Sequence, residues 1–173
     1  MPPPLPPSVA QHRADAPHRL RLAVLTVSDT RTPADDASGD LIVERAEAAG
    51  HVVAERAIVP DEPDAMRPLL QGYRDRDDLH ATLITGGTGI SPRDQTFETV
   101  SALLTKPVFG FGELFRMLSY AEIGSAAILS RAVGGVAGRH ILLVMPGSVA
   151  AVRLAMDRII IPELPHLVRE ARK

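Results

Sequence analysis

Short β-rich apolar runs alternate with helical patterns from residue 20 onward, and this alternation constrains the fold more than any other feature of the chain. Strands separated by helices pair in parallel through right-handed crossovers, with the helices on both faces of the sheet. The sequence therefore predicts an α/β domain over residues 20–170, a three-layer α/β/α sandwich with a mostly parallel central sheet. Strands are expected at residues 20–27, 52–59 and 81–85, and helices at residues 40–49, 64–73, 96–104 and 111–120.

The last third of the chain has a different texture. Two apolar runs, residues 127–132 and 140–145, flank a glycine-rich segment, and this pattern predicts two adjacent strands joined by a turn. A helix capped by Ser148 is expected to follow. Pro162 and Pro165 are expected to interrupt the end of that helix, because proline lacks the N–H that a helix interior needs.

Composition excludes several classes of function. With a formal charge of −2 and 3% aromatic residues, the chain lacks the basic field and the stacking rings that nucleic-acid binding uses. It has no cysteine, which removes disulfides, cysteine zinc sites and cysteine nucleophiles. The proline-rich residues 1–19 are expected to form a flexible tail and do not fit a secretory signal. No apolar run approaches the ~20 residues that span a bilayer, so a cytoplasmic protein without membrane partners is expected.

Polar segments follow four of the expected strands at the points where those strands end. In parallel sheets, ligands bind beyond the carboxyl ends of the strands. Because these ends meet at one edge, the four segments are expected to contribute to a single site. They are residues 28–31, which include Ser28 and Asp29, residues 60–62, residues 86–94, and residues 146–148, which are Pro146, Gly147 and Ser148.

The strongest of these segments is Gly86-Gly87-Thr88-Gly89. Three glycines in four positions let the backbone approach a ligand closely and point its N–H groups at an anion. The segment lacks the lysine of a P-loop and the spacing of a dinucleotide fingerprint, which argues against both of those sites. A tight turn that binds nothing is the alternative interpretation.

Two carboxylates and an arginine lie in the same segments. Asp94 follows Arg93 beyond the glycines, and together they offer a magnesium ligand and a phosphate clamp side by side. Asp61 ends the second expected strand and could share the Mg²⁺ with Asp94. The alternatives are a surface ion pair between Arg93 and Asp94, and a capping or turn role for Asp61.

Weaker candidates lie in the second half of the chain. Glu113 sits among glycines that permit close approach, or it merely favours a helix N-terminus. Ser130 and Arg131 leave an expected strand and could bind an acidic ligand. Ser148 could begin a helix whose N–H groups face a phosphate, or it could act only as a cap. The six histidines show no metal-binding spacing and the chain has no nucleophile elbow, so zinc and serine-hydrolase chemistry are disfavoured.

These segments resemble, in order along the chain, the motifs of the MoaB and MogA family of molybdenum-cofactor biosynthesis proteins. The resemblance covers roughly residues 20–165, and residues 115–124 look more like the MoaB branch. One motif would be weak evidence, but several in order are specific. The matching motifs are Thr26-Val-Ser-Asp29, Val59-Pro60-Asp61-Glu62, Thr85-Gly-Gly-Thr-Gly89, Arg93-Asp94, Gly110-Phe-Gly-Glu113, Ala127-Ile-Leu-Ser-Arg131 and Pro146-Gly147.

The resemblance implies a molybdopterin-binding sandwich that assembles with copies of itself, as a trimer or as a hexamer. It implies Mg²⁺-dependent transfer of an adenylyl group from ATP to the terminal phosphate of molybdopterin, with release of pyrophosphate. The two catalytic aspartates of the family match Asp61 and Asp94, which would also hold the Mg²⁺. The loop that holds the pterin phosphate and the nucleotide matches residues 86–89.

Two other functions stay open at the level of sequence. A non-catalytic molybdopterin-binding or scaffold protein would use the same pocket, although the presence of both Asp61 and Asp94 favours the enzyme. A generic nucleotide-binding sensor would bind ATP without any need for molybdopterin.

Overall fold

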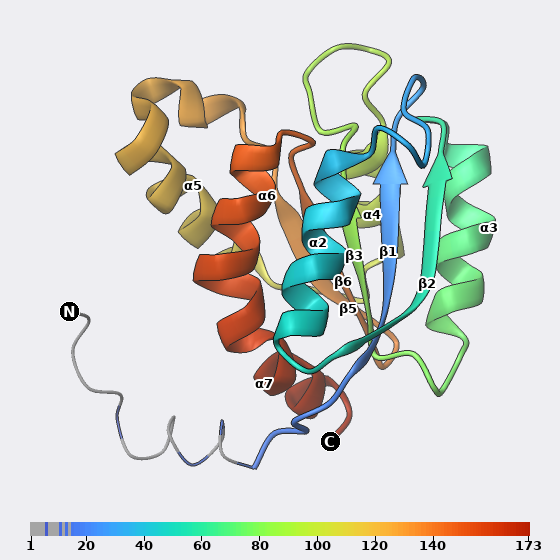
Figure 1. The fold of residues 1–173 in the computed structure, drawn as a ribbon, viewed down its shortest axis with the longest axis vertical. Coiled ribbons are helices and arrows are strands. Elements are labelled where there is room, and N and C mark those ends of the chain that lie inside the picture. The colour runs from blue at the N-terminus through green and yellow to red at the C-terminus, as the bar shows by residue number, and fades with distance from the viewer. Residues whose placement is uncertain (1–5, 7–10, 12, 14) are drawn as a thin grey trace.

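A six-stranded sheet forms the centre of the computed structural model, which describes residues 6, 11, 13 and 15–173 (Figure 1). The strands are β1 (Arg21–Val27), β2 (Val52–Val59), β3 (Ala81–Thr85), β4 (Lys106–Pro107), β5 (Val133–Ala137) and β6 (His140–Met145). Their order across the sheet is β2-β1-β3-β6-β5-β4. The pairs β1–β2, β1–β3 and β3–β6 are parallel, and β5 is antiparallel to both of its neighbours.

Helices cover both faces of this sheet, which confirms the predicted α/β/α sandwich (Figure 1). They are α2 (Ala37–Ala48), α3 (Pro63–Arg74), α4 (Thr96–Leu103), α5 (Phe109–Ile123), the 3₁₀ helix η1 (Gly124–Leu129), α6 (Val149–Ala155), the π-helical turn η2 (Met156–Ile160) and α7 (Ile161–Ala171). α2, α5, α6 and α7 pack on one face, and α3 and α4 pack on the other.

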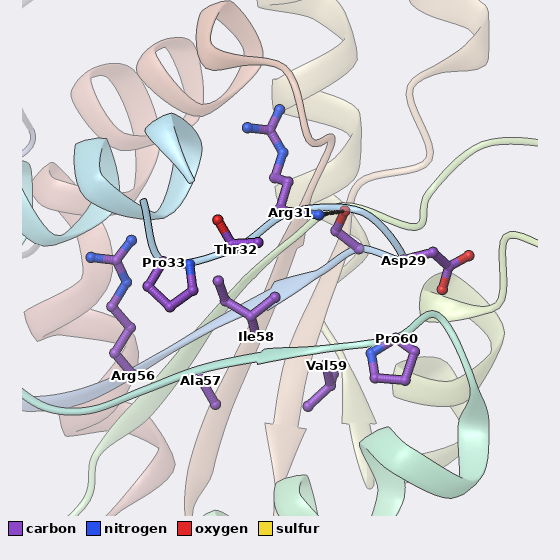
Figure 2. Close-up of a pocket in the computed structure, with 10 residues that line it drawn as sticks. Asp29, Arg31, Thr32, Pro33, Arg56, Ala57, Ile58, Val59 and Pro60 are labelled. Atoms are coloured by element: carbon purple, nitrogen blue, oxygen red, sulfur yellow. Dashed lines mark hydrogen bonds between the residues drawn. The ribbon is translucent and has the colours of Figure 1, made fainter. Parts of the chain in front are cut away.

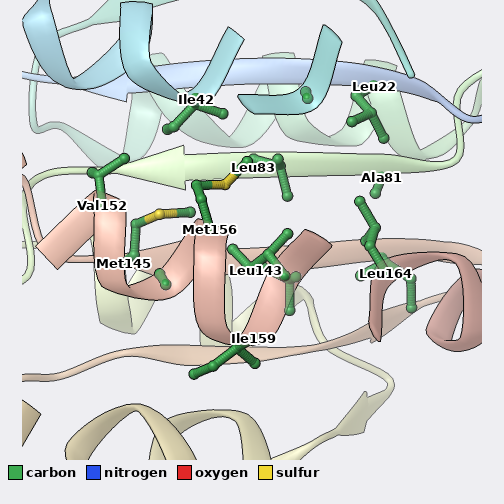
Figure 3. Close-up of a cluster of buried hydrophobic side chains, with 14 of the residues drawn as sticks. Leu22, Ile42, Ala81, Leu83, Leu143, Met145, Val152, Met156, Ile159 and Leu164 are labelled. Atoms are coloured by element: carbon green, nitrogen blue, oxygen red, sulfur yellow. The ribbon is translucent and has the colours of Figure 1, made fainter. Parts of the chain in front are cut away.

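The central strands are buried on both faces, which explains why their sequences are continuously apolar. In β1, Leu22 and Val24 point into the cluster beneath α2, α6 and α7, part of which Figure 3 shows. Leu25 and Val27 point into the cluster beneath α3 and α4. Each such side chain contributes about 1.5–3 kcal/mol relative to leaving it exposed, so the parallel strands and their helices are held together mainly by this burial.

The strand predicted at residues 127–132 is wrong. Residues 124–129 form η1, and the strand begins only at Val133. A short apolar run does not distinguish a strand from a helical segment, and here Ile128 is 82% exposed. The glycines assigned to the turn lie inside β5, where a Cβ atom on Gly134 would lie 2.4 Å from the Leu143 side chain. The turn itself falls at Gly138, whose φ is +67°.

The predicted interruption of the last helix is also wrong. The chain stays helical from α6 through η2 into α7, past both Pro162 and Pro165. In η2 the Ile161 N–H bonds to the Met156 carbonyl oxygen, a wider turn than that of an α-helix. Because Pro162 has no N–H and its ring displaces the carbonyl one turn earlier, the widened turn accommodates it without ending the helix.

Helix starts differ from the predictions by a few residues. α2 begins at Ala37 because the Asp36 side chain accepts the Gly39 N–H at 3.0 Å, and it ends at the expected Gly50, whose φ is +86°. Most of the predicted flexible tail, residues 1–19, lies outside the described residues. In its described part, Arg13 pairs with Glu163 of α7.

Candidate functional site

The carboxyl ends of β1, β2, β3 and β6 lie at one edge of the sheet, and the loops that follow them contact one another (Figure 1). The Ser28 N–H donates to the Val59 carbonyl oxygen at 2.9 Å, which joins the first two loops. The Gly86 N–H donates to the Met145 carbonyl oxygen at 3.2 Å, and a Cβ atom on Gly147 would lie 3.2 Å from the Gly86 Cα. The four polar segments therefore form one continuous surface.

Two glycines of the central loop are required by its shape. Gly86 has a φ of +99°, and a Cβ atom there would lie 2.2 Å from the Val27 carbonyl oxygen. Gly87 has a φ of +62°, and a Cβ atom there would lie 2.1 Å from Thr96 Oγ1 and 2.4 Å from Asp61 Oδ2. Any other residue would be strained or would clash at both positions, so the loop packs directly against neighbouring backbone and side chains.

The peptide groups of this glycine loop, residues 86–90, are polarised. The Gly87 carbonyl oxygen accepts the Thr96 N–H, and the Thr88 and Gly89 carbonyl oxygens accept hydrogen bonds from the Arg131 guanidinium. Within the described part of the chain, the N–H groups of residues 87–90 have no hydrogen-bond acceptor. The N–H groups in this row are unpaired, and the neighbouring carbonyl oxygens already accept hydrogen bonds. This charge distribution is that of an anion-binding nest.

Asp61 is buried, with 5% of its surface exposed, at the end of β2. Its Oδ1 atom accepts the Gln95 N–H at 3.0 Å and the Thr96 hydroxyl at 3.3 Å, so it satisfies donors at the start of α4. Burial raises the pKa of Asp61 above its ordinary value, and the charges of Asp94 and Asp29 act in the same direction. Asp61 therefore has a structural role at the start of α4, and its position places this carboxylate close to Asp94 and Asp29.

Asp94 contacts the glycine loop two residues further along, at Gly89. Its Oδ2 atom accepts the Ser91 N–H at 3.2 Å and the Ser91 hydroxyl at 2.5 Å. A Cβ atom on Gly89 would lie 2.6 Å from the same oxygen. Asp61 thus packs against Gly87 and Asp94 packs against Gly89, so the two carboxylates, distant in sequence, contact the same loop.

Arg93 pairs with carboxylates of two other loops rather than with its neighbour Asp94. Its Nε and one terminal nitrogen donate to the two oxygens of Asp29 at 2.8 and 2.7 Å, and it reaches Glu62 at 3.3 Å. Asp29 also accepts the Asp61 N–H at 3.1 Å. The hydrogen bonds from Arg93, followed by that from the Asp61 N–H, lower the pKa of Asp29 to about 2. Three strand-end loops are therefore linked through one guanidinium.

Arg131 precedes β5 and does not leave a strand, which corrects the predicted placement. Its Nε atom donates to the Thr88 carbonyl oxygen at 3.0 Å, and a terminal nitrogen donates to that of Gly89. The same guanidinium pairs with Glu98 and lies 4.9 Å from the centre of the Phe97 ring. Arg131 therefore faces the carbonyl side of the glycine loop.

The remaining predicted residues occupy separate positions. Ser28 Oγ accepts the Arg31 N–H at 3.1 Å and shapes the first loop. Ser148 caps α6 by accepting the Ala151 N–H at 3.2 Å, as its alternative interpretation held. Glu113 lines a different cavity, of about 400 Å³, between α4 and α5. Ser130, Pro146 and Ser148 share a smaller cavity of about 120 Å³ between α5 and α6.

A larger cavity, of about 620 Å³, lies between the first loop and the edge strand β2 (Figure 2). Asp29 and Arg31 line it from the loop, and Arg56 and Ile58 line it from the strand. Arg56 pairs with the buried Asp36 at 3.0 Å. The sequence analysis missed Arg56, although two charged residues, Glu55 and Arg56, inside an apolar strand are a signal that could have found it.

Comparison with known proteins identifies the family of the chain. The family model described as a probable molybdopterin binding domain matches residues 23–166. Molybdenum cofactor biosynthesis protein B of Bacillus subtilis is 52% identical over 168 residues, which cover 96% of this chain and 98% of that protein. No described helix is both long enough and apolar enough to cross a membrane.

Solved structures give the same relationship. A crystal structure of a molybdenum cofactor biosynthesis protein B is 49% identical, with a TM-score of 0.87, and the match covers 91% of this chain and 98% of that one. A structure of MogA is 27% identical, with a TM-score of 0.75 and coverage of 87% and 99%. The higher identity to the B proteins confirms the predicted branch. The chain therefore belongs to the MoaB and MogA family of probable molybdopterin-binding domains.

Proposed function

We propose that this protein acts in molybdenum cofactor biosynthesis by transferring the adenylyl group of ATP to the terminal phosphate of molybdopterin. The observation that carries the proposal is that Asp61 and Asp94 both pack against a loop whose N–H groups are unpaired. Carboxylates that hold a cation beside an anion nest suit a reaction between two phosphate groups. The names of the B-protein relatives support the same pathway.

The side chains at the site fit Mg²⁺ as an ion shared with the substrate. Among the described residues, no cluster of three or more histidines, aspartates or glutamates is arranged to hold a metal alone. Asp61 Oδ2 and Asp94 Oδ1 accept no hydrogen bond from the described part of the chain. Mg²⁺ commonly takes one or two carboxylates together with water and substrate phosphates, so these two oxygens match its needs.

The reaction needs no side-chain nucleophile. A terminal phosphate oxygen of molybdopterin forms a bond to the α-phosphorus of ATP, and the bond from that phosphorus to the bridging oxygen breaks, which releases pyrophosphate. Mg²⁺, when held by Asp61 and Asp94, supplies positive charge that reduces the repulsion between the two anions. The N–H groups of the glycine loop bind phosphate oxygens and hold the reacting groups in position.

Arg93 has to exchange partners to act as a phosphate clamp. In this structure it neutralises Asp29 and Glu62 at the mouth of the site, and half of its side-chain surface is exposed. Entry of a phosphate group beside it would replace those carboxylates with a stronger bidentate acceptor. Asp29 also lines the 620 Å³ cavity, whose volume falls within the range of ligand pockets, so we place the rest of the nucleotide there.

The direct test is to incubate the protein with molybdopterin, ATP and Mg²⁺ and to look for adenylylated molybdopterin and pyrophosphate by chromatography. Product formation that requires all three components is expected. ATP consumption without molybdopterin would instead indicate a different nucleotide-dependent function.

One observation favours a second candidate function, a molybdopterin-binding protein without turnover. Asp61 already serves two donors at the start of α4, which gives it a structural reason to be present in a non-catalytic protein. Titration calorimetry separates the two functions. A non-catalytic protein would bind molybdopterin with or without ATP and would release no pyrophosphate.

We also propose that the protein forms a homo-oligomer through α5 and η1. These elements stand beside the sheet in Figure 1 and carry most of the large exposed apolar side chains. Exposed apolar side chains that gather on two consecutive helices are a feature of interaction sites in soluble proteins. The exposed side chains of this apolar face are Phe109, Leu114, Met117, Tyr120, Ile123, Ile128 and Leu129.

A further inference from the structure

We propose that Arg131 is a positioning residue, which turns the N–H groups of the glycine loop toward a bound anion without contacting that anion itself. The nature of the anion, a phosphate group of ATP or molybdopterin, rests on the proposed function. The geometry of the loop does not depend on it. This role differs from the direct binding of an acidic ligand that the sequence predicts for Arg131.

Arg131 sets the orientation of two peptide groups of the glycine loop. In a trans peptide the C=O and the following N–H point in opposite directions. The Thr88 carbonyl oxygen faces Arg131, so the Gly89 N–H faces away from it, and the Gly89 carbonyl does the same for the Ile90 N–H. On the other side, the Gly87 carbonyl oxygen is held by the Thr96 N–H. Arg131 thus fixes two of the four consecutive peptide groups whose amides are unpaired.

The guanidinium of Arg131 already has bonding partners within the protein. Its charge is paired with the Glu98 carboxylate, and its plane lies against the Phe97 ring. Only 23% of its side-chain surface is exposed. An anion bound by the opposite, N–H side of the loop would have the peptide groups between itself and the guanidinium. Arg131 therefore acts on the anion through the peptide groups that it orients.

The role of residue 131 requires the planar shape of an arginine side chain. A guanidinium presents several N–H donors in one plane, so it can hold two successive carbonyl oxygens and a carboxylate at once. A lysine ammonium is a point charge on a flexible stem and does not reproduce that arrangement. Charge at this position is thus insufficient, and the planar shape is the property that matters.

The decisive experiment removes the partner of Arg131 and leaves Arg131 in place. In the full-length protein, Glu98→Ala deletes the carboxylate that anchors the guanidinium, and calorimetry measures the affinity for inorganic pyrophosphate. A positioning role predicts affinity several-fold weaker, because the loop carbonyls lose a fixed donor. A direct contact predicts the opposite sign, because a released and uncompensated arginine would bind the anion more tightly. Tighter binding would overturn the proposal.

A matched control is Glu44→Ala, which removes another helix-surface glutamate paired with an arginine, Arg45, on α2. It should leave the pyrophosphate affinity unchanged. If Glu44→Ala weakens binding as much as Glu98→Ala, the effect is one of net charge and the proposal fails.

Arg131→Lys supplies a second readout. We expect a loss of about tenfold in pyrophosphate affinity, since misaligned hydrogen bonds to an anion are costly, with kcat reduced and with the salt dependence of the remaining binding unchanged. Affinity at the unaltered level would contradict the proposal. Because pyrophosphate binding is measured without molybdopterin, the proposal and the proposed function can fail separately: absent turnover with these affinity changes intact would sink only the function.

Discussion

Asp61 and Asp94 have the same carboxylate side chain but differ in their structural roles. Asp61 is buried and accepts hydrogen bonds from two donors at the start of α4, whereas Asp94, within the described residues, bonds only to Ser91. Replacing Asp61 leaves buried donors without an acceptor, which costs about 1–3 kcal/mol. The two positions are therefore expected to separate stability from activity.

The corresponding prediction is that Asp61→Ala and Asp94→Ala both abolish adenylyl transfer, and that only Asp61→Ala lowers the free energy of unfolding by more than about 1 kcal/mol. Urea denaturation and the product assay measure the two quantities. Equal losses of stability would contradict the assignment of a structural role to Asp61 alone, and turnover by Asp94→Ala would remove Asp94 from the mechanism.

Two glycines offer a second contrast at the residue scale. Gly87→Ala should destabilise the fold and abolish anion binding, because φ is +62° and the new methyl group would meet Thr96 and Asp61. Gly72→Ala, inside α3, should stabilise it by about 0.5–1 kcal/mol, because no atom lies within 4 Å of the new methyl group and alanine favours a helix. Thermal unfolding distinguishes them; a stable, pyrophosphate-binding Gly87→Ala variant would refute the account of the loop.

At the scale of elements, three histidines lie where strands begin, at the edge opposite the site. His51 and His80 accept the N–H groups of Leu20 and Arg21 at 3.4 and 2.9 Å, and His140 opens β6 with Nε2 2.8 Å from Thr82 Oγ1. Burial lowers the pKa of all three side chains, that of His140 to about 4. These strand starts are therefore built for neutral imidazoles.

The consequence is acid sensitivity below neutral pH. A histidine with a pKa lowered by folding binds its proton more readily in the unfolded chain, so stability is complete above pH ~6.5 and falls as the pH drops toward 4. His140 alone accounts for at most about 3 kcal/mol over that window. Denaturation at pH 7.5 and pH 5 should show the loss, and His140→Asn should reduce it. A pH-independent free energy of unfolding would contradict this.

The sequence predicted β1, β2, β3, β6 and their helices because continuous apolar runs and turn residues specify them locally. It missed β5 because Gly134 and Gly135 are typical turn residues, and only the close approach of β6 and β4 makes them suitable for a strand. At the site, the edge of the sheet that collects Asp61 and Asp94 followed from parallel topology. The partners of Arg93 and Arg131 did not, because both arginines bond to groups more than thirty residues away.

At the scale of the whole molecule, the apolar face of α5 and η1 predicts assembly. Met117 and Ile128 are 62% and 82% exposed, and replacing both by lysine should convert the expected trimer or hexamer into monomers. Gln71→Lys is the matched control, since Gln71 is exposed on α3, which packs on the opposite face of the sheet from α5. Light scattering after size exclusion measures the mass; an unaltered protein that is already monomeric would disprove the assignment.

The order of strands has a consequence for how the chain is made. β6 lies between β3 and β5 near the middle of the sheet, although it is the last strand to be synthesised. A nascent chain whose residues 140–145 have not yet emerged from the ribosome can pair β1, β2 and β3. The edge of β3 that pairs with β6 in the complete fold then stays unpaired. Unpaired strand edges of this kind favour association between nascent chains. Premature termination before β6 should therefore produce aggregates rather than a smaller folded protein.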